Sequence, residues 1–149
     1  MKDAAPKVVV DAVRWWTPKS DKSVDFAEVR DYILSLRQRG FDIRIVTFDR
    51  WNSHDMMKQK NAYGMKSEIL SVAKKHYDDM QLVVTEERLT GPKIPLLIDE
   101  LLQLRIMKND KVDHPRKGSK DLSDAVCGAI YNAVAHTPRN FDQEIKIYN

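Results

Sequence analysis

Two short runs of β-branched and aromatic residues, separated by one amphipathic segment, constrain the fold of this chain more than any other feature. The runs Lys7–Trp16 and Ile43–Asp49 are predicted to be strands. Between them, after a predicted cap at Asp25, apolar side chains recur at helical spacing from Phe26 until Gly40. Strand, helix and strand with short connections predict a βαβ unit, in which the two strands run parallel and the helix covers one face of a sheet.

The middle of the chain is predicted to alternate between short helices and strands, because apolar runs there are brief and are broken by Gly and Pro. The predicted elements are a helix over 56–63 ended by Gly64, a strand over Glu68–Val72, a turn of helix over Lys74–Met80, a segment Leu82–Leu89 that fits either strand or helix, and a helix passing into an extended piece over Ile94–Met107.

The clearest helix begins close to Asp121, with Ser119 as its predicted N-cap, and ends before Pro138. One continuous apolar stripe defines it: Leu122, Ala125, Val126, Ala129, Ile130, Ala133 and Val134. Cys127 lies inside this stripe and is predicted to be a buried structural thiol. Because it is the single cysteine, an intramolecular disulfide is excluded.

Length and composition predict one globular α/β domain over residues 1–149, with a core over about 7–137 and a loose C-terminal arm over 138–149. Apolar residues make up 42% and charged residues 32% of the chain, which disfavours wholesale disorder. No apolar run approaches the ~20 residues that span a bilayer, and the N-terminus lacks the apolar core of a signal peptide, so an intracellular protein without a membrane partner is expected. The net charge of +3 is compatible with a polyanionic partner.

Three carboxylates are candidates for a metal site. Asp49 ends a predicted strand, where open α/β folds bind their ligands, although a residue there also serves simply to end the strand. Asp121 and Asp124 lie about one turn apart at a helix start, where the helix dipole alone also favours acidic residues. The pair borders the apolar stripe and should point toward the sheet edge. Converging anions are stable only with a bound cation, so the pattern predicts a Mg²⁺ or Mn²⁺ site.

Several basic residues lie just before the acidic pair in the sequence. Arg116, Lys117 and Lys120 precede the helix, and the side chains and helix amides there could bind phosphate; a solvated loop is the alternative. Arg50 follows Asp49 and is a further candidate for binding DNA. His114 could orient a water or accept a proton, or it could hydrogen-bond within its own turn. The tryptophans are predicted to be core or sheet-surface aromatics, and the absence of a GxxxxGK[ST] motif excludes ATP hydrolysis by a P-loop.

Several motifs, in order, resemble the C-terminal nuclease domain of the large terminase subunit of tailed phages. The likeness covers roughly residues 7–137. The motifs are Val46–Ser53, the pattern Gly64–Val72 followed by Tyr77, Glu86–Leu89, Glu100–Leu104, Lys111–Pro115 and Gly118–Ala125.

The resemblance implies an RNase H-like mixed sheet flanked by helices and a metal-dependent endonuclease that cuts concatemeric double-stranded DNA during genome packaging. It implies metal ligands at Asp49 and in the Asp121–Asp124 cluster, binding two Mg²⁺ or Mn²⁺ ions, with Asp124 slightly preferred as the essential ligand of that cluster. It also implies a packaging ATPase domain, a small terminase subunit and a portal as partners, in the cytoplasm of a bacterial host.

The chain departs from the family pattern at its N-terminus. The resemblance implies that it begins at the family's third strand, so we expect it to lack two central strands and the aspartate that is the family's first metal ligand. Either another polypeptide supplies those strands, or Lys7–Trp16 pairs directly with Ile43–Asp49. The alternative function is therefore a non-catalytic DNA-binding or docking module of the packaging motor. A junction resolvase fits the chemistry but not the order of the motifs.

Overall fold

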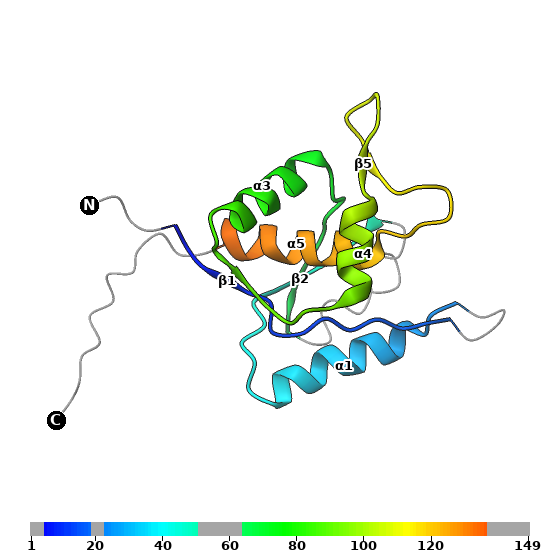
Figure 1. Ribbon diagram of the computed structural model, residues 1–149. Helices are drawn as coiled ribbons and strands as arrows, with labels where there is room; N and C mark the ends of the chain where they lie inside the picture. Colours follow the sequence, from blue (N-terminus) through cyan, green and yellow to red (C-terminus); the bar gives the residue numbers. More distant parts are fainter. Residues whose placement is uncertain (1–4, 19–22, 51–63, 137–149) are drawn as a thin grey trace.

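The computed structural model describes residues 5–18, 23–50 and 64–136 and has the α/β composition predicted from the sequence (Figure 1). The predicted helix over 56–63 and the arm over 138–149 lie outside the described residues. The elements in chain order are β1 (Val8–Val9), α1 (Phe26–Gln38), β2 (Ile45–Phe48), β3 (Lys66–Ile69), α3 (Lys74–Thr85), β4 (Leu89–Thr90), α4 (Pro95–Gln103), β5 (Arg105–Ile106), β6 (Val112–Asp113) and α5 (Asp121–Ala135).

The strands form three separate pairs within the described residues. β1 pairs with β4 and β2 pairs with β3, both parallel, whereas β5 and β6 form an antiparallel hairpin. The predicted βαβ unit is therefore not formed by the described residues, because β1 and β2 belong to different sheets, and the alternative in which Lys7–Trp16 pairs directly with Ile43–Asp49 is wrong. A helical connection allows two strands to run parallel, but later segments of the chain can pair with the same strand edges. Here β4 pairs with β1, and β3 pairs with β2.

Several predicted boundaries also need correction. The first strand is limited to Val8–Val9, which pair with Leu89–Thr90 of β4, and its last hydrogen bond runs from the N–H of Val10 to the carbonyl of Thr90. The third strand begins and ends earlier than predicted, at Lys66–Ile69, in register with β2.

Helix α3 is longer than the single turn predicted for Lys74–Met80. It continues through Leu82 to Thr85 because His76, Met80 and Val83 lie on one face and are all buried. The segment that fitted either strand or helix is therefore divided, with its start in α3 and Leu89 in β4. The predicted passage from a helix to an extended piece is confirmed by α4 and β5.

Helix α1 and its N-terminus agree with the sequence prediction. The Asp25 side chain accepts a hydrogen bond of 2.8 Å from the backbone N–H of Ala27, as an N-cap residue does. The extended chain beside α1 places Arg14 over the ring of Tyr32, at 4.7 Å, with Trp16 edge-on to the same tyrosine. Trp16 is thus part of a surface aromatic cluster.

Helix α5 is central to the molecule, with α3 and α4 beside it in Figure 1 and β2 behind it. The buried core joins Val126, Cys127 and Ile130 of α5 to Met80 and Val83 of α3, with Val8 of β1. Burial raises the pKa of the Cys127 thiol to about 12, which agrees with the predicted structural thiol.

The apolar stripe predicted for α5 is only partly correct, because Ala125 and Ala129 are exposed. The buried face is instead centred between Ser123 and Ile130 and includes Gly128, where a Cβ atom would lie 3.2 Å from Leu70 Cδ2. Small apolar residues do not specify a buried face as strongly as large ones do. Among the helices of the described residues, none is long and apolar enough to span a bilayer.

Candidate active site

The first turn of α5 holds two of the three predicted carboxylates. Asp121 is the first helical residue and is exposed, and Asp124 is half-buried one turn later. The N-cap residue is Lys120 rather than the predicted Ser119, whose hydroxyl accepts a longer bond of 3.3 Å from the N–H of Asp121. The acidic pair therefore begins the helix as predicted, with a cation at the cap position.

Both carboxylate oxygens of Asp124 have partners. The Tyr77 hydroxyl of α3 donates to Oδ1 at 2.6 Å, and Lys120 Nζ lies 2.9 Å from Oδ2. Burial, together with the hydrogen bond to Asp124, raises the pKa of Tyr77 far above its usual value, so the hydroxyl remains a neutral donor. The tertiary structure thus fixes the orientation of Asp124.

A carboxylate that the sequence prediction missed supports the same turn. Glu100 of α4 is only 6% exposed, and its Oε2 accepts a 2.8 Å hydrogen bond from the backbone N–H of Ser123. It satisfies one of the free N–H groups at the start of α5, where a negative charge is also favoured by the helix dipole. The signal was present in the sequence, because Glu100 interrupts the apolar face of α4 between Leu97 and Leu101.

Asp49 has a different environment at the end of β2. It is exposed, and its Oδ1 accepts a 2.7 Å hydrogen bond from the backbone N–H of Arg50, the turn-capping role that was the simpler reading of this residue. Two residues earlier, Thr47 Oγ1 accepts a 2.9 Å hydrogen bond from Asn132 Nδ2 of α5. Thr47 of β2 therefore faces α5, and Asp49 is the first residue after the strand.

The strand pair β2–β3 packs on helix α5. Thr47 contacts α5 at Asn132, and Leu70, which hydrogen-bonds to Phe48, packs one turn earlier at Gly128. Both strands therefore pack against the middle of α5. Asp49 directly follows β2, and the acidic pair begins the helix that β2 contacts.

The described residues nevertheless do not close a metal site. Aspartate oxygens are ligands that Mg²⁺ and Mn²⁺ prefer, so the donor chemistry of the three candidates is suitable. No group of three or more acidic, His or Cys side chains placed to hold a metal ion exists in 5–18, 23–50 and 64–136. The structure therefore does not bring Asp49, Asp121 and Asp124 together into one such group.

The basic loop before α5 is exposed at Arg116 and Lys117, whereas Lys120 is partly buried against Asp124. A tight turn shapes this loop, since a Cβ atom on Gly118 would approach the side chains of His114 and Pro115 to 3.3 and 3.2 Å. Arg50 is exposed beside Asp49. The four predicted DNA-binding cations thus flank the two acidic regions, and Trp51 lies outside the described residues.

His114 makes the local contact expected of a turn residue. Its Nδ1 lies 2.6 Å from the carbonyl oxygen of Pro115, and since a carbonyl can only accept, Nδ1 is the donor of this hydrogen bond. Neighbouring Asp113 has a lowered pKa, because Lys111 and then the backbone N–H of His114 donate to it. An accessory role for His114 in catalysis stays a prediction.

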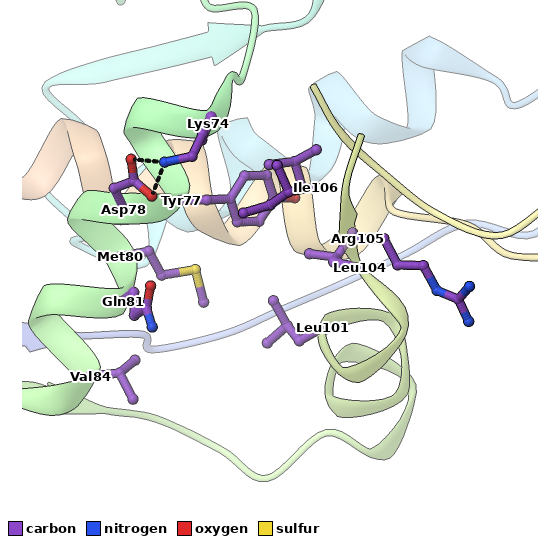
Figure 2. Close-up of a pocket in the computed structure, with 11 residues that line it drawn as sticks. Lys74, Tyr77, Asp78, Met80, Gln81, Val84, Leu101, Leu104, Arg105 and Ile106 are labelled. Atoms are coloured by element: carbon purple, nitrogen blue, oxygen red, sulfur yellow. Dashed lines mark hydrogen bonds and ion pairs between the residues drawn. The ribbon is translucent and has the colours of Figure 1, made fainter. Parts of the chain in front are cut away.

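A cleft of about 300 Å³ lies between α3, α4 and the β5–β6 hairpin. Figure 2 shows its mainly apolar lining, with Met80 and Val84 opposite Leu101, and an ion pair between Lys74 and Asp78 on the α3 side. Tyr77 belongs to this lining, so the residue that holds Asp124 also forms part of the cleft wall.

Comparison with known proteins gives one distant relationship. The chain is 25% identical to an uncharacterized protein, MJ0330, of the archaeon Methanocaldococcus jannaschii, over an alignment that covers 93% of this chain. The matched part makes up 27% of that relative, so this chain spans about a quarter of its length. No protein-family model matches the chain, and no solved structure matches it.

Proposed function

We propose that this chain is a metal-dependent DNA endonuclease domain of the terminase large-subunit type, with an RNase H-like fold that needs additional strands. The observation that supports the proposal most is the packing of β2, which Asp49 follows directly, on α5, the helix whose first turn carries Asp121 and Asp124. The ordered set of terminase-like motifs supports it independently.

In this proposal the three aspartates hold Mg²⁺ or Mn²⁺, and bound ions supply water activation and stabilisation of the leaving oxygen. Tyr77 and Glu100 keep the first turn of α5 in place. Arg50, Arg116, Lys117 and Lys120 bind the duplex backbone, which gives little sequence preference and a steep dependence on salt. By the same resemblance, the partners are a packaging ATPase domain, a small terminase subunit and a portal in a phage-infected bacterium.

The experiment is cleavage of supercoiled plasmid with and without Mn²⁺, by the wild type and by Asp49→Ala. We expect nicking that requires the ion and is lost in the variant. Asp42→Ala is the matched control, because Asp42 is also exposed, lies before the same strand and forms only a local ion pair with Arg44. Full activity of Asp49→Ala would remove this mechanism.

A second candidate function is a DNA-binding or docking module that does not cut by itself. Two observations favour it: β1 and β2 each pair on one edge only within the described residues, and those residues lack a closed group of three ligands. Unpaired strand edges accept further strands readily. DNA binding without Mn²⁺-dependent cleavage would select this function, and cleavage restored by a polypeptide that supplies strands ending in Asp would explain it.

A further inference from the structure

Lys120 occupies an unfavourable position for a cation. As the N-cap residue of α5, it lies at the end of the helix where the dipole and the free N–H groups favour anions. Its ion pair with Asp124 also has the less favourable order, with the cation four residues before the anion. Helix stability therefore gives no reason for a lysine at this site.

Asp124 does not depend on Lys120 for its orientation. Tyr77 donates its single hydroxyl proton to Asp124 at 2.6 Å, since the other nearby oxygen, Ser123 Oγ, is farther away at 3.2 Å. Ser123 in turn donates to the carbonyl of Lys120. When the lysine side chain leaves, Oδ1 remains held by α3 and only Oδ2 loses its partner.

Lys120 differs from the other cations of its loop. Arg116 and Lys117 are exposed and have no carboxylate partner among the described residues, whereas the Lys120 side chain is 21% exposed and is bound to Asp124. A phosphate approaching the loop therefore meets two free cations and one that is held by an acid.

We propose that the Lys120–Asp124 pair is a substrate-gated latch. DNA phosphate competes with Asp124 for Lys120, so binding of the duplex frees Asp124 Oδ2, while Tyr77 keeps the carboxylate in place. This inference rests on the proposed function, and it assigns to that site a regulation by its own substrate. No covalent step or proton transfer is involved.

The test is duplex DNA binding in EDTA, measured by fluorescence anisotropy with a labelled duplex of generic sequence. Asp124→Asn keeps an oxygen that can accept the hydrogen bond from Tyr77, but it removes the negative charge that attracts Lys120. Asp121→Asn removes the same charge one turn away, where no lysine is bound. We expect Asp124→Asn to strengthen binding about two- to fivefold more than Asp121→Asn, the range of a partly exposed ion pair.

Two lysine backgrounds make the test specific. In Lys120→Met the difference between the two Asn variants should vanish, whereas in Lys117→Met it should persist. Equal effects of the two Asn variants, or a difference that survives in Lys120→Met, would overturn the latch while leaving DNA binding intact. A wild-type protein that does not bind DNA would overturn both the latch and the proposed function.

Discussion

Asp124 and Asp49 are the same residue type and are both candidate metal ligands, but their surroundings differ. Asp124 is half-buried and held by side chains from two sources, Tyr77 of α3 and Lys120 of its own helix. Asp49 is exposed, and within 5–18, 23–50 and 64–136 its side chain accepts a hydrogen bond only from the N–H of the next residue. The first carboxylate is fixed by tertiary contacts, whereas the second can still turn toward a ligand.

Because of this difference, we expect the two residues to contribute differently to the stability of the fold. A residue that is tied into the fold contributes to both, whereas an exposed residue at a strand end contributes to function almost alone. Variants at the two sites therefore separate these two contributions or show that the distinction fails.

The largest effect that we expect is a loss of DNA cleavage, and it should be equally large when Asp49 or Asp124 is replaced. Asp49→Ala and Asp124→Ala should each lower Mn²⁺-dependent plasmid nicking by about 100-fold or more, because each removes a proposed ligand. Initial nicking rates on agarose gels measure this. If only one variant loses activity, the two carboxylates do not belong to one site.

The stability of the same two variants should differ. Asp124→Ala should lower the free energy of unfolding by about 2 kcal/mol, because the half-buried Tyr77 hydroxyl loses a charge-assisted acceptor. Asp49→Ala should change it by less than about 0.5 kcal/mol, as expected of an exposed site. Urea denaturation followed by tryptophan fluorescence gives both values, and equal values would contradict the comparison.

Glu100 tests the support of the acidic turn from α4. Glu100→Ala should destabilise the protein by about 1–2 kcal/mol, the usual cost of losing a helix cap, because the N–H of Ser123 loses its acceptor. Glu100→Gln keeps an acceptor oxygen and should cost clearly less. An equal loss in both variants would mean that the charge, and not the cap, matters.

Tyr77 tests the support from α3. Tyr77→Phe keeps the ring in the cleft wall and removes the hydroxyl, so we expect a loss of about 1 kcal/mol in the free energy of unfolding. Tyr131→Phe is the matched control, since that ring packs on His76 and does not contact Asp124. In the Asp124→Ala background the cost of Tyr77→Phe should disappear.

The smallest effect concerns pH. His76 is buried beside Tyr77, its Nδ1 accepts from the N–H of Ala73, and burial lowers its pKa below the ordinary 6.5. The unfolded chain therefore takes up the proton first, so this contribution to stability is complete above about pH 6.5 and is lost as the pH falls below it. Its slope cannot exceed about 1.4 kcal/mol per pH unit. Urea denaturation at pH 7.5 and 5.5 should show the loss, and His76→Asn should reduce it.

Local patterns predicted the elements that depend on local interactions. The helix over Phe26–Gln38, the strand Ile45–Phe48 and the helix over Asp121–Ala135 were all predicted within two residues, because each has a clear cap or period. The burial of Cys127 also followed from its neighbours. Strand pairing did not follow, because a short parallel strand such as β1 acquires its partner from Leu89–Thr90, far along the chain.

The sequence by itself determined that Asp121, Asp124 and Asp49 end or begin regular elements, with cations close to them. Only the tertiary structure decided that Asp124 is held by Tyr77, which is 47 residues away, and that the start of α5 is capped by Glu100, 23 residues before Ser123. The physical reason is that caps and periods arise within a few residues, whereas these hydrogen bonds form only after helices from distant parts of the chain have packed together.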